Sequence, residues 1–171
     1  QLFAQAESGL MGLALAADFA DSREVYTCHS SADHSDNRVT AWTAAEDWSE
    51  LADPRVLVEG IPLSDGGLHS GCRILAHPDG TLYIGTGDAF TGPAPQDPTS
   101  LSGKILHVDR DGTPAGDTDI DGAPADSPVL TYGHRNVQGL ALQPGSGRIY
   151  SAEHGPAVDD EVNLVRPGGN Y

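Results

Sequence analysis

The sequence predicts an all-β fold made of β-propeller blades, and three observations support that expectation. A strand–turn–strand pattern recurs three times along the 171 residues. Further short apolar strands follow each occurrence, which gives units of about four strands. Glycine (21 residues) and proline (12 residues) are spread along the chain without a short period, as expected where turns join many short strands.

Each repeat begins with an apolar strand, passes through a turn rich in Pro, Asp or Gly, and returns with a strand carrying an aliphatic–Tyr pair. This order of residue types is typical of a β-hairpin. The three hairpins are expected at residues 13–26, 74–83 and 140–150. The strands expected after them are residues 38–42, 55–58, 104–108, 128–132 and 161–165.

The predicted units form one partial propeller domain over residues 1–171. They cover residues 9–63, 68–132 and, incompletely, 136–171. Propellers usually close with roughly 4–8 blades, so we expect this chain to be part of a longer protein. A β-sandwich whose hairpins are similar by chance is the alternative. Two segments rich in Ser, Asp, Pro and Gly, 29–37 and 89–102, are expected to be loops.

The charge balance argues against two classes of partner. Nine Lys and Arg against 25 Asp and Glu give a formal net charge of −16, whereas nucleic-acid binding needs a basic surface. An acidic surface also repels anionic membranes, and no segment approaches the roughly 18 continuous apolar residues of a membrane span. Genome composition or a salty habitat can equally explain such acidity.

The two cysteines, Cys28 and Cys72, allow one disulfide at most and identify no compartment by themselves. They fall in different predicted units. Neighbouring blades seldom bring such strands within the Cα separation of about 7 Å that a disulfide requires. We therefore expect two free, buried thiols.

Polar residues cluster where the innermost strand of the second unit begins and where the next strand ends. His69 lies about ten residues before the turn at Asp79 and Asp88 about nine after it, so a hairpin places His69 and Asp88 side by side. A carboxylate that fixes the tautomer of an imidazole and stabilises its protonated form prepares a general base. A hydrogen bond that only joins two strands would use the same residues, and both interpretations stay open.

A second polar cluster precedes the innermost strand of the third unit. Arg135 and Asn136 offer a forked cation and an amide, which suit a ligand with carboxylates or carbonyls. The arginine could equally pair with surface acids. The acidic run 159–161 could bind a hard cation through oxygen atoms or could simply be solvated.

Taken together, these motifs resemble the glucose/sorbosone dehydrogenase family of soluble six-bladed propellers, which use pyrroloquinoline quinone (PQQ). The resemblance runs from residue 9 to residue 171. Its most specific segments are 132–141, 153–156 and 160–165, with 96–98 and 101–106 as further matches. The implied fold is a six-bladed β-propeller, of which this chain is roughly two full blades and part of a third.

The resemblance implies roles for the polar residues. His69 matches the base that takes the proton of the sugar C1 hydroxyl as hydride passes to the quinone, and Asp88 matches the aspartate that orients it. Arg135 and Asn136 match residues that contact the quinone. Glu7 stands where the best-known members carry a glutamine that contacts the cofactor.

Calcium is the second cofactor that the resemblance implies. Gly155 and Pro156 match a pair whose carbonyl oxygens hold the Ca²⁺ that polarises the quinone, while Glu161 and the backbone at Tyr171 match a second, structural site. The family also implies an aldose substrate, an external electron acceptor and a periplasmic or extracellular location. Leu68 departs from the family pattern just before the base, which bears on sugar preference.

Two other functions compete with this interpretation. A non-catalytic binding propeller would have no need of a base, so the presence of both His69 and Asp88 argues against it. A propeller lactonase would need several carboxylate or imidazole ligands converging on a channel metal, and the sequence offers no clear set. Family cofactor ligands from the other blades are outside this chain, so the isolated chain is expected to be inactive.

Overall fold

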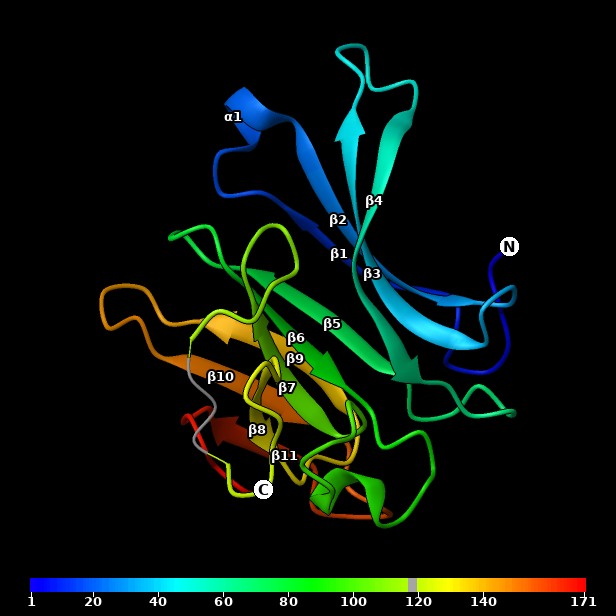
Figure 1. Cartoon of the computed structure of the whole chain (residues 1–171), viewed down its shortest axis with the longest axis vertical. Helices are drawn as coiled ribbons and strands as arrows, with labels where there is room; N and C mark the ends of the chain where they lie inside the picture. The colour runs from blue at the N-terminus through cyan, green and yellow to red at the C-terminus, as the bar shows by residue number, and fades with distance from the viewer. Residues whose placement is uncertain (117–119) are drawn as a thin grey trace.

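The computed structural model describes residues 1–116 and 120–171, and its regular secondary structure is almost entirely antiparallel strands in three sheets (Figure 1). The first sheet contains β1 (Leu10–Leu15), β2 (Glu24–Ser31), β3 (Asp36–Ala44) and β4 (Leu51–Pro62), with α1 (Phe19–Ser22) between β1 and β2. The second contains β5 (Gly71–Ala76), β6 (Leu82–Thr86), β7 (Lys104–Val108) and β8 (Val129–Tyr132), with the short 3₁₀ helix η1 (Ala94–Gln96). The third contains β9 (Val137–Leu142), β10 (Ile149–Glu153) and β11 (Glu161–Leu164). Within these ranges, none of the helices is long and apolar enough to cross a membrane.

The three sheets repeat one arrangement. In each sheet the strands follow one another in chain order, so every neighbour is reached by a hairpin connection. The first strands of the sheets lie beside one another, because β1 contacts β5 and β5 contacts β9 (Figure 1). The expected all-β fold is confirmed, and the beginnings of β5 and β9 come close together.

The hydrophobic core lies between the first and second sheets. Tyr26, Val39 and Ile61 extend from the first sheet and are 0–1% exposed. Ile84 and Leu106 of the second sheet are completely buried. Burial of one such side chain contributes about 1.5–3 kcal/mol, so this core fixes the strand ends that carry the polar clusters.

The expectation of a loop over residues 29–37 is wrong. Strand β2 continues to Ser31 and β3 begins at Asp36, which leaves a turn of only residues 32–35. The polar residues of this segment bond to one another across and along the strands: Ser30 Oγ donates to Asn37 Oδ1 at 2.6 Å. Because their polar groups are paired, these residues can extend a sheet despite a composition typical of a loop. The segment 89–102 does lie outside the strands, as expected.

The expectation of two free thiols is also wrong, because Cys28 and Cys72 form a disulfide with a Cα separation of 5.5 Å. The reason is Gly12 on β1, which pairs with Cys28 and lies against β5. A Cβ at Gly12 would lie 2.5 Å from the carbonyl oxygen of Cys72 and 3.0 Å from Cys28 Cβ. Without that atom, the second strand of one sheet reaches past the first to the inner strand of the next.

Candidate active site

The backbone around the start of β5 brings His69 toward the end of β6. Gly71 pairs with Thr86 in the β5–β6 hairpin, so the residues just outside this pair lie at the same end. His69 has a φ of +52°, in the left-handed region. Gly87 allows the close approach, because a Cβ there would lie 1.8 Å from the carbonyl oxygen of His69.

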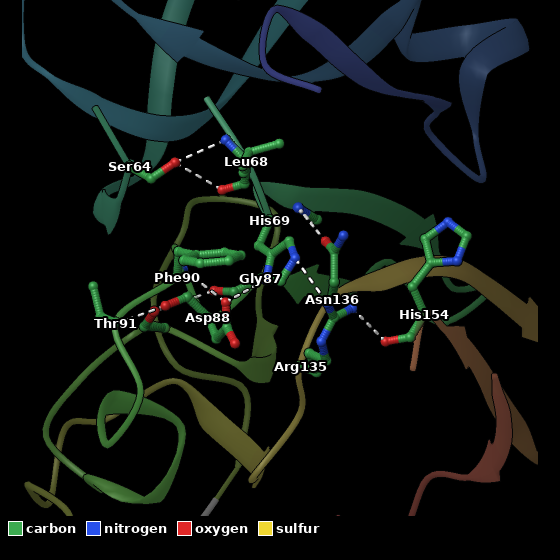
Figure 2. Close-up of polar contacts among 12 residues, drawn as sticks. Ser64, Leu68, His69, Gly87, Asp88, Phe90, Thr91, Arg135, Asn136 and His154 are labelled. Carbon is green, nitrogen blue, oxygen red and sulfur yellow. Dashed lines mark hydrogen bonds and ion pairs between the residues drawn. The ribbon is translucent and has the colours of Figure 1, made fainter. Parts of the chain in front are cut away.

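His69, Asp88 and Arg135 form a connected polar group (Figure 2). His69 Nδ1 lies 2.7 Å from Asp88 Oδ1, and Arg135 Nη2 lies 3.0 Å from His69 Nε2. A guanidinium can only donate, so Nε2 accepts from Arg135 and Nδ1 carries the proton given to Asp88. The predicted proximity of His69 and Asp88 is therefore present, and the tautomer leaves the lone pair on Nε2.

Arg135 is held through its backbone as well as its side chain. Its N–H donates to Glu153 Oε2 at 2.8 Å, and its carbonyl oxygen accepts from the N–H of Asp88 at 2.7 Å. Its Nη1 donates to the carbonyl oxygen of His154 at 2.9 Å (Figure 2). The guanidinium thus lies between the third sheet and the imidazole of His69.

Glu7 and Asn136, the other two predicted cofactor residues, support the same group from behind. Glu7 Oε2 accepts from the N–H of His69 and from Asn136 Nδ2, each at 3.0 Å. Asn136 Oδ1 accepts from the N–H of Gly71 at 3.1 Å and from Gln138 Nε2 at 3.0 Å. Asn136 is 1% exposed and its amide is engaged at both ends. Contact of Glu7 or Asn136 with a cofactor stays a prediction.

The four residues predicted for calcium line one small cavity. Gly155, Pro156, Glu161 and Tyr171 surround a volume of about 130 Å³, next to Arg135. The sequence divided them between two sites, Gly155 and Pro156 in one and Glu161 and Tyr171 in the other. In the structure all four line this one cavity, and Arg135 lines it as well.

Backbone oxygens crowd the loop at one wall of this cavity. A Cβ at Gly155 would lie 2.2 Å from the carbonyl oxygen of Val158 and 2.6 Å from that of Asp159. The N–H of Gly155 donates to Asp160 Oδ1 at 3.0 Å, which closes the loop. Oxygen donors are the ligands of Ca²⁺. No group of three or more His, Cys, Asp or Glu side chains that could hold a metal occurs within residues 1–116 and 120–171.

Sequence reasoning assigned no role to a second histidine–carboxylate pair, His134 and Glu153. His134 Nδ1 lies 2.9 Å from Glu153 Oε1, and its ring stacks on Tyr171 with centroids 4.7 Å apart. Burial raises the pKa of Glu153, but hydrogen bonds from His134, the Arg135 N–H and Asn163 outweigh it and hold that pKa below its ordinary value. A signal for this pair exists, because it has the same 19-residue spacing as His69 and Asp88.

Phe90 is the other residue that sequence reasoning missed. Its ring lies 4.7 Å from the imidazole of His69, centroid to centroid, and the residue is 66% exposed. It follows Asp88 by two positions, and a lone aromatic residue in a polar loop was the signal for it.

The chain is similar to several known proteins over almost its whole length. The family model of the glucose/sorbosone dehydrogenases matches residues 1–171. The PQQ-bound aldose sugar dehydrogenase of Streptomyces coelicolor superposes with a TM-score of 0.90 and 39% identity, covering 99% of this chain and 49% of that one. The aldose sugar dehydrogenase YliI of Escherichia coli is 32% identical over 99% of this chain and 47% of its own length. The quinoprotein glucose dehydrogenase B of Acinetobacter calcoaceticus is 30% identical over 98% and 40%.

The chain therefore spans less than half the length of these two curated relatives. Its three sheets correspond to about half of a β-propeller of this type. With the family model matching from the first residue to the last, the chain belongs to the glucose/sorbosone dehydrogenase family.

Proposed function

We propose that the full-length protein is a PQQ-dependent dehydrogenase that oxidises the C1 hydroxyl of an aldose to the lactone, with His69 as the general base. The observation that carries this proposal is the tautomer of His69, whose Nδ1 proton is given to Asp88 and whose Nε2 is an acceptor. A neutral imidazole of this kind can take the sugar O1 proton, and Asp88 stabilises the imidazolium that forms.

The residues around this base fit an anionic quinone cofactor in part. Arg135 supplies a cation that pairs with no carboxylate side chain among residues 1–116 and 120–171, where its guanidinium contacts a carbonyl oxygen and an imidazole. Glu7 carries the opposite charge, and we propose that it acts mainly by fixing the N–H of His69 and the amide of Asn136. When bound, the quinone supplies the acceptor for the hydride that leaves C1.

The proposal requires the Arg135 side chain to take two positions, one on His69 Nε2 and one on a bound ligand. In the structure it donates to Nε2, the atom that must accept the sugar proton. A carboxylate-bearing ligand offers the guanidinium a stronger, charge-assisted partner. We infer that Arg135 releases Nε2 when such a ligand binds, so that the base becomes available only when the cofactor is in place.

We propose calcium at the cavity lined by Gly155, Pro156, Glu161 and Tyr171. The oxygen-rich backbone of residues 155–159 and the Glu161 carboxylate are the donor type that Ca²⁺ prefers. The disulfide between Cys28 and Cys72 supports a periplasmic or extracellular location, because such bonds persist in oxidising compartments.

The test uses the full-length protein freed of metal and cofactor. Reduction of an artificial dye acceptor is followed with D-glucose, D-galactose, D-xylose and maltose, with PQQ and Ca²⁺ added separately and together. We expect dye reduction only when both are present. Absence of turnover with every aldose would overturn the proposed function, whereas turnover that survives a calcium chelator would remove only the calcium assignment.

A further inference from the structure

An exposed aromatic side chain, Phe90, lies beside the ring of His69, and Leu68 directly precedes the histidine in the sequence. Leu68, directly before His69, is 39% exposed, and Phe90 is 66% exposed. Figure 2 shows the Phe90 ring beside the imidazole, with Leu68 on the neighbouring turn. The centroids of the Phe90 and His69 rings lie 4.7 Å apart, with an angle of 57° between the ring planes. An exposed aromatic ring in contact with a candidate catalytic side chain offers a ligand an apolar surface at the place where chemistry would occur.

The backbone holds the Phe90 ring in place at an energetic cost. Ala89 and Phe90 have φ values of +49° and +62°, a region that glycine adopts freely and that a bulky residue rarely occupies. Asp88 maintains this turn, because its Oδ1 accepts from the N–H of Phe90 at 2.7 Å. The carboxylate that orients His69 therefore also fixes the aromatic ring next to it. Strain of this kind concentrates at ligand sites.

Leu68 is fixed by a separate contact. Its N–H donates to Ser64 Oγ and its carbonyl oxygen accepts from the same hydroxyl, both at 2.8 Å (Figure 2). A single serine thus ties both backbone groups of Leu68 without using its side chain. The turn before His69 and the turn after Asp88 are thus each closed by a hydrogen-bonded side chain, Ser64 in the first and Asp88 in the second.

We propose that Phe90 is the platform on which the C–H face of an aldopyranose stacks while its O1 hydroxyl reaches His69. This rests on the proposed function and specifies its substrate: a sugar in the ring form, recognised partly through its apolar face. Pyranose rings present C–H groups on their faces and hydroxyls at their rim, so an aromatic ring binds the former. The hydroxyls stay available to polar residues.

The test is Phe90→Gly in the full-length enzyme loaded with PQQ and Ca²⁺. Glycine suits the positive φ and keeps the N–H that Asp88 accepts, so the melting temperature should stay equal or rise. We expect KM for the preferred aldose of the panel to rise about three- to tenfold with kcat within about twofold. The affinity for PQQ, titrated in the absence of sugar, should not change. Phe90→Tyr keeps a ring and should keep the wild-type KM.

Trp48 provides a matched control. It is an aromatic residue in the connection between β3 and β4, with a φ of +62° and 63% exposure, and it stacks on Phe19 rather than on a catalytic group. Trp48→Gly should leave KM unchanged.

An unchanged KM in Phe90→Gly, an equal rise in Trp48→Gly, or a lowered melting temperature in Phe90→Gly would overturn the platform. A wild-type enzyme that oxidises no aldose would instead overturn the proposed function itself.

Discussion

His69 with Asp88 and His134 with Glu153 occupy corresponding places in two neighbouring sheets. In each pair the histidine precedes the first strand of its sheet, and the carboxylate comes 19 residues later, at the end of the second strand or just beyond it. The Nδ1–carboxylate distances, 2.7 and 2.9 Å, are nearly equal. The hairpins of the two sheets therefore build the same pair twice.

The pairs differ at the other ring nitrogen. His134 Nε2 bonds to Thr131 Oγ1 at 2.8 Å, and its ring is 0% exposed beneath Tyr171. His69 Nε2 accepts from Arg135, a side chain that can move to another anion. A histidine–carboxylate pair alone is thus a structural device of these hairpins. Chemistry becomes possible where Nε2 has a partner that can leave and where the surrounding surface is open to a ligand.

The largest expected effect separates the two histidines directly. His69→Gln removes the base and should lower kcat by about 10²–10⁴-fold in the full-length enzyme, the usual contribution of general base catalysis. His134→Gln breaks two buried hydrogen bonds away from the substrate, so it should lower the melting temperature and change kcat by less than about tenfold. Steady-state kinetics and thermal unfolding of both variants measure this difference.

The PQQ affinity of His69→Gln serves as the control and should stay close to that of the wild type. If His69→Gln keeps full turnover, His69 is structural and the assignment of the base is wrong. If His134→Gln loses as much kcat as His69→Gln, the proposed distinction is wrong between the His69–Asp88 pair, whose Nε2 can be freed (the open pair), and the fully buried His134–Glu153 pair (the closed pair).

The pairs also differ in what anchors them, since only the strand after His69 carries a disulfide. The bond between Cys28 and Cys72 closes a 44-residue separation, which the chain-entropy model values at about 4 kcal/mol. The double substitution Cys28→Ser/Cys72→Ser should lower the free energy of unfolding by up to that amount. Chemical denaturation measures it, and reduced wild-type protein should behave like the double variant. An unchanged denaturation midpoint would show that core packing alone holds β5 to the first sheet.

The sequence was sufficient to predict the hairpins and the meeting of His69 with Asp88. Both follow from local rules: turn residues set the hairpin, and near-equal offsets from the turn set the neighbours. The contact of Arg135 with His69 depends on how two sheets pack, which residue spacing within one hairpin does not specify. The family resemblance predicted Arg135 as a cofactor-binding residue, but it did not predict the hydrogen bond from Arg135 to His69 Nε2.

The errors have the same origin. The disulfide was missed because Gly12 opens a path between sheets, and its effect is visible only when β1 lies on β5. The loop expected over 29–37 is strand because Ser30 and Asn37 satisfy each other. In both cases a contact between strands, across two sheets for the disulfide and within one hairpin for Ser30 and Asn37, outweighed a local preference. Phe90 was missed for a different reason, since a lone aromatic residue in a polar loop can indicate a ligand contact but does not show which side chain it lies beside.

A smaller effect concerns Lys104, which holds the backbone of the loop that contacts the residue before His134, a member of the buried His134–Glu153 pair. Its Nζ is buried and donates to the carbonyl oxygens of Ala94, Pro95 and Ser102. Pro95 O also accepts from the N–H of Gly133, next to His134. Burial lowers the pKa of Lys104 to about 8. The unfolded chain keeps this proton up to about pH 10.4, so between these values it binds more protons than the folded protein.

Because the unfolded chain binds more protons in this pH range, raising the pH favours the folded protein. The free energy of unfolding of the wild type, measured against Lys104→Met, should increase from pH 8 to pH 10, by about 3 kcal/mol at most. Denaturation of both proteins at several pH values measures it. A difference that stays flat across this range would mean that the three carbonyls keep the ammonium charged.

The smallest expected effect tests whether Glu153 fixes Arg135 electrostatically. Its carboxylate accepts from His134, Asn163 and the backbone N–H of Arg135, and these bonds lower its pKa against the effect of burial. A lowered carboxyl pKa contributes stability that is complete above about pH 4.5 and is lost as pH falls through the folded value. Glu153→Gln should therefore cost about 1.5 kcal/mol at pH 7, and its difference from wild type should shrink below pH 4.5. Glu50→Gln, at an exposed carboxylate, is the control and should change stability by less than about 0.5 kcal/mol at every pH. A difference in free energy of unfolding between wild type and Glu153→Gln that is constant down to pH 3 would show that shape, not charge, holds the Arg135 backbone. The His134–Glu153 pair would then position Arg135 by packing alone.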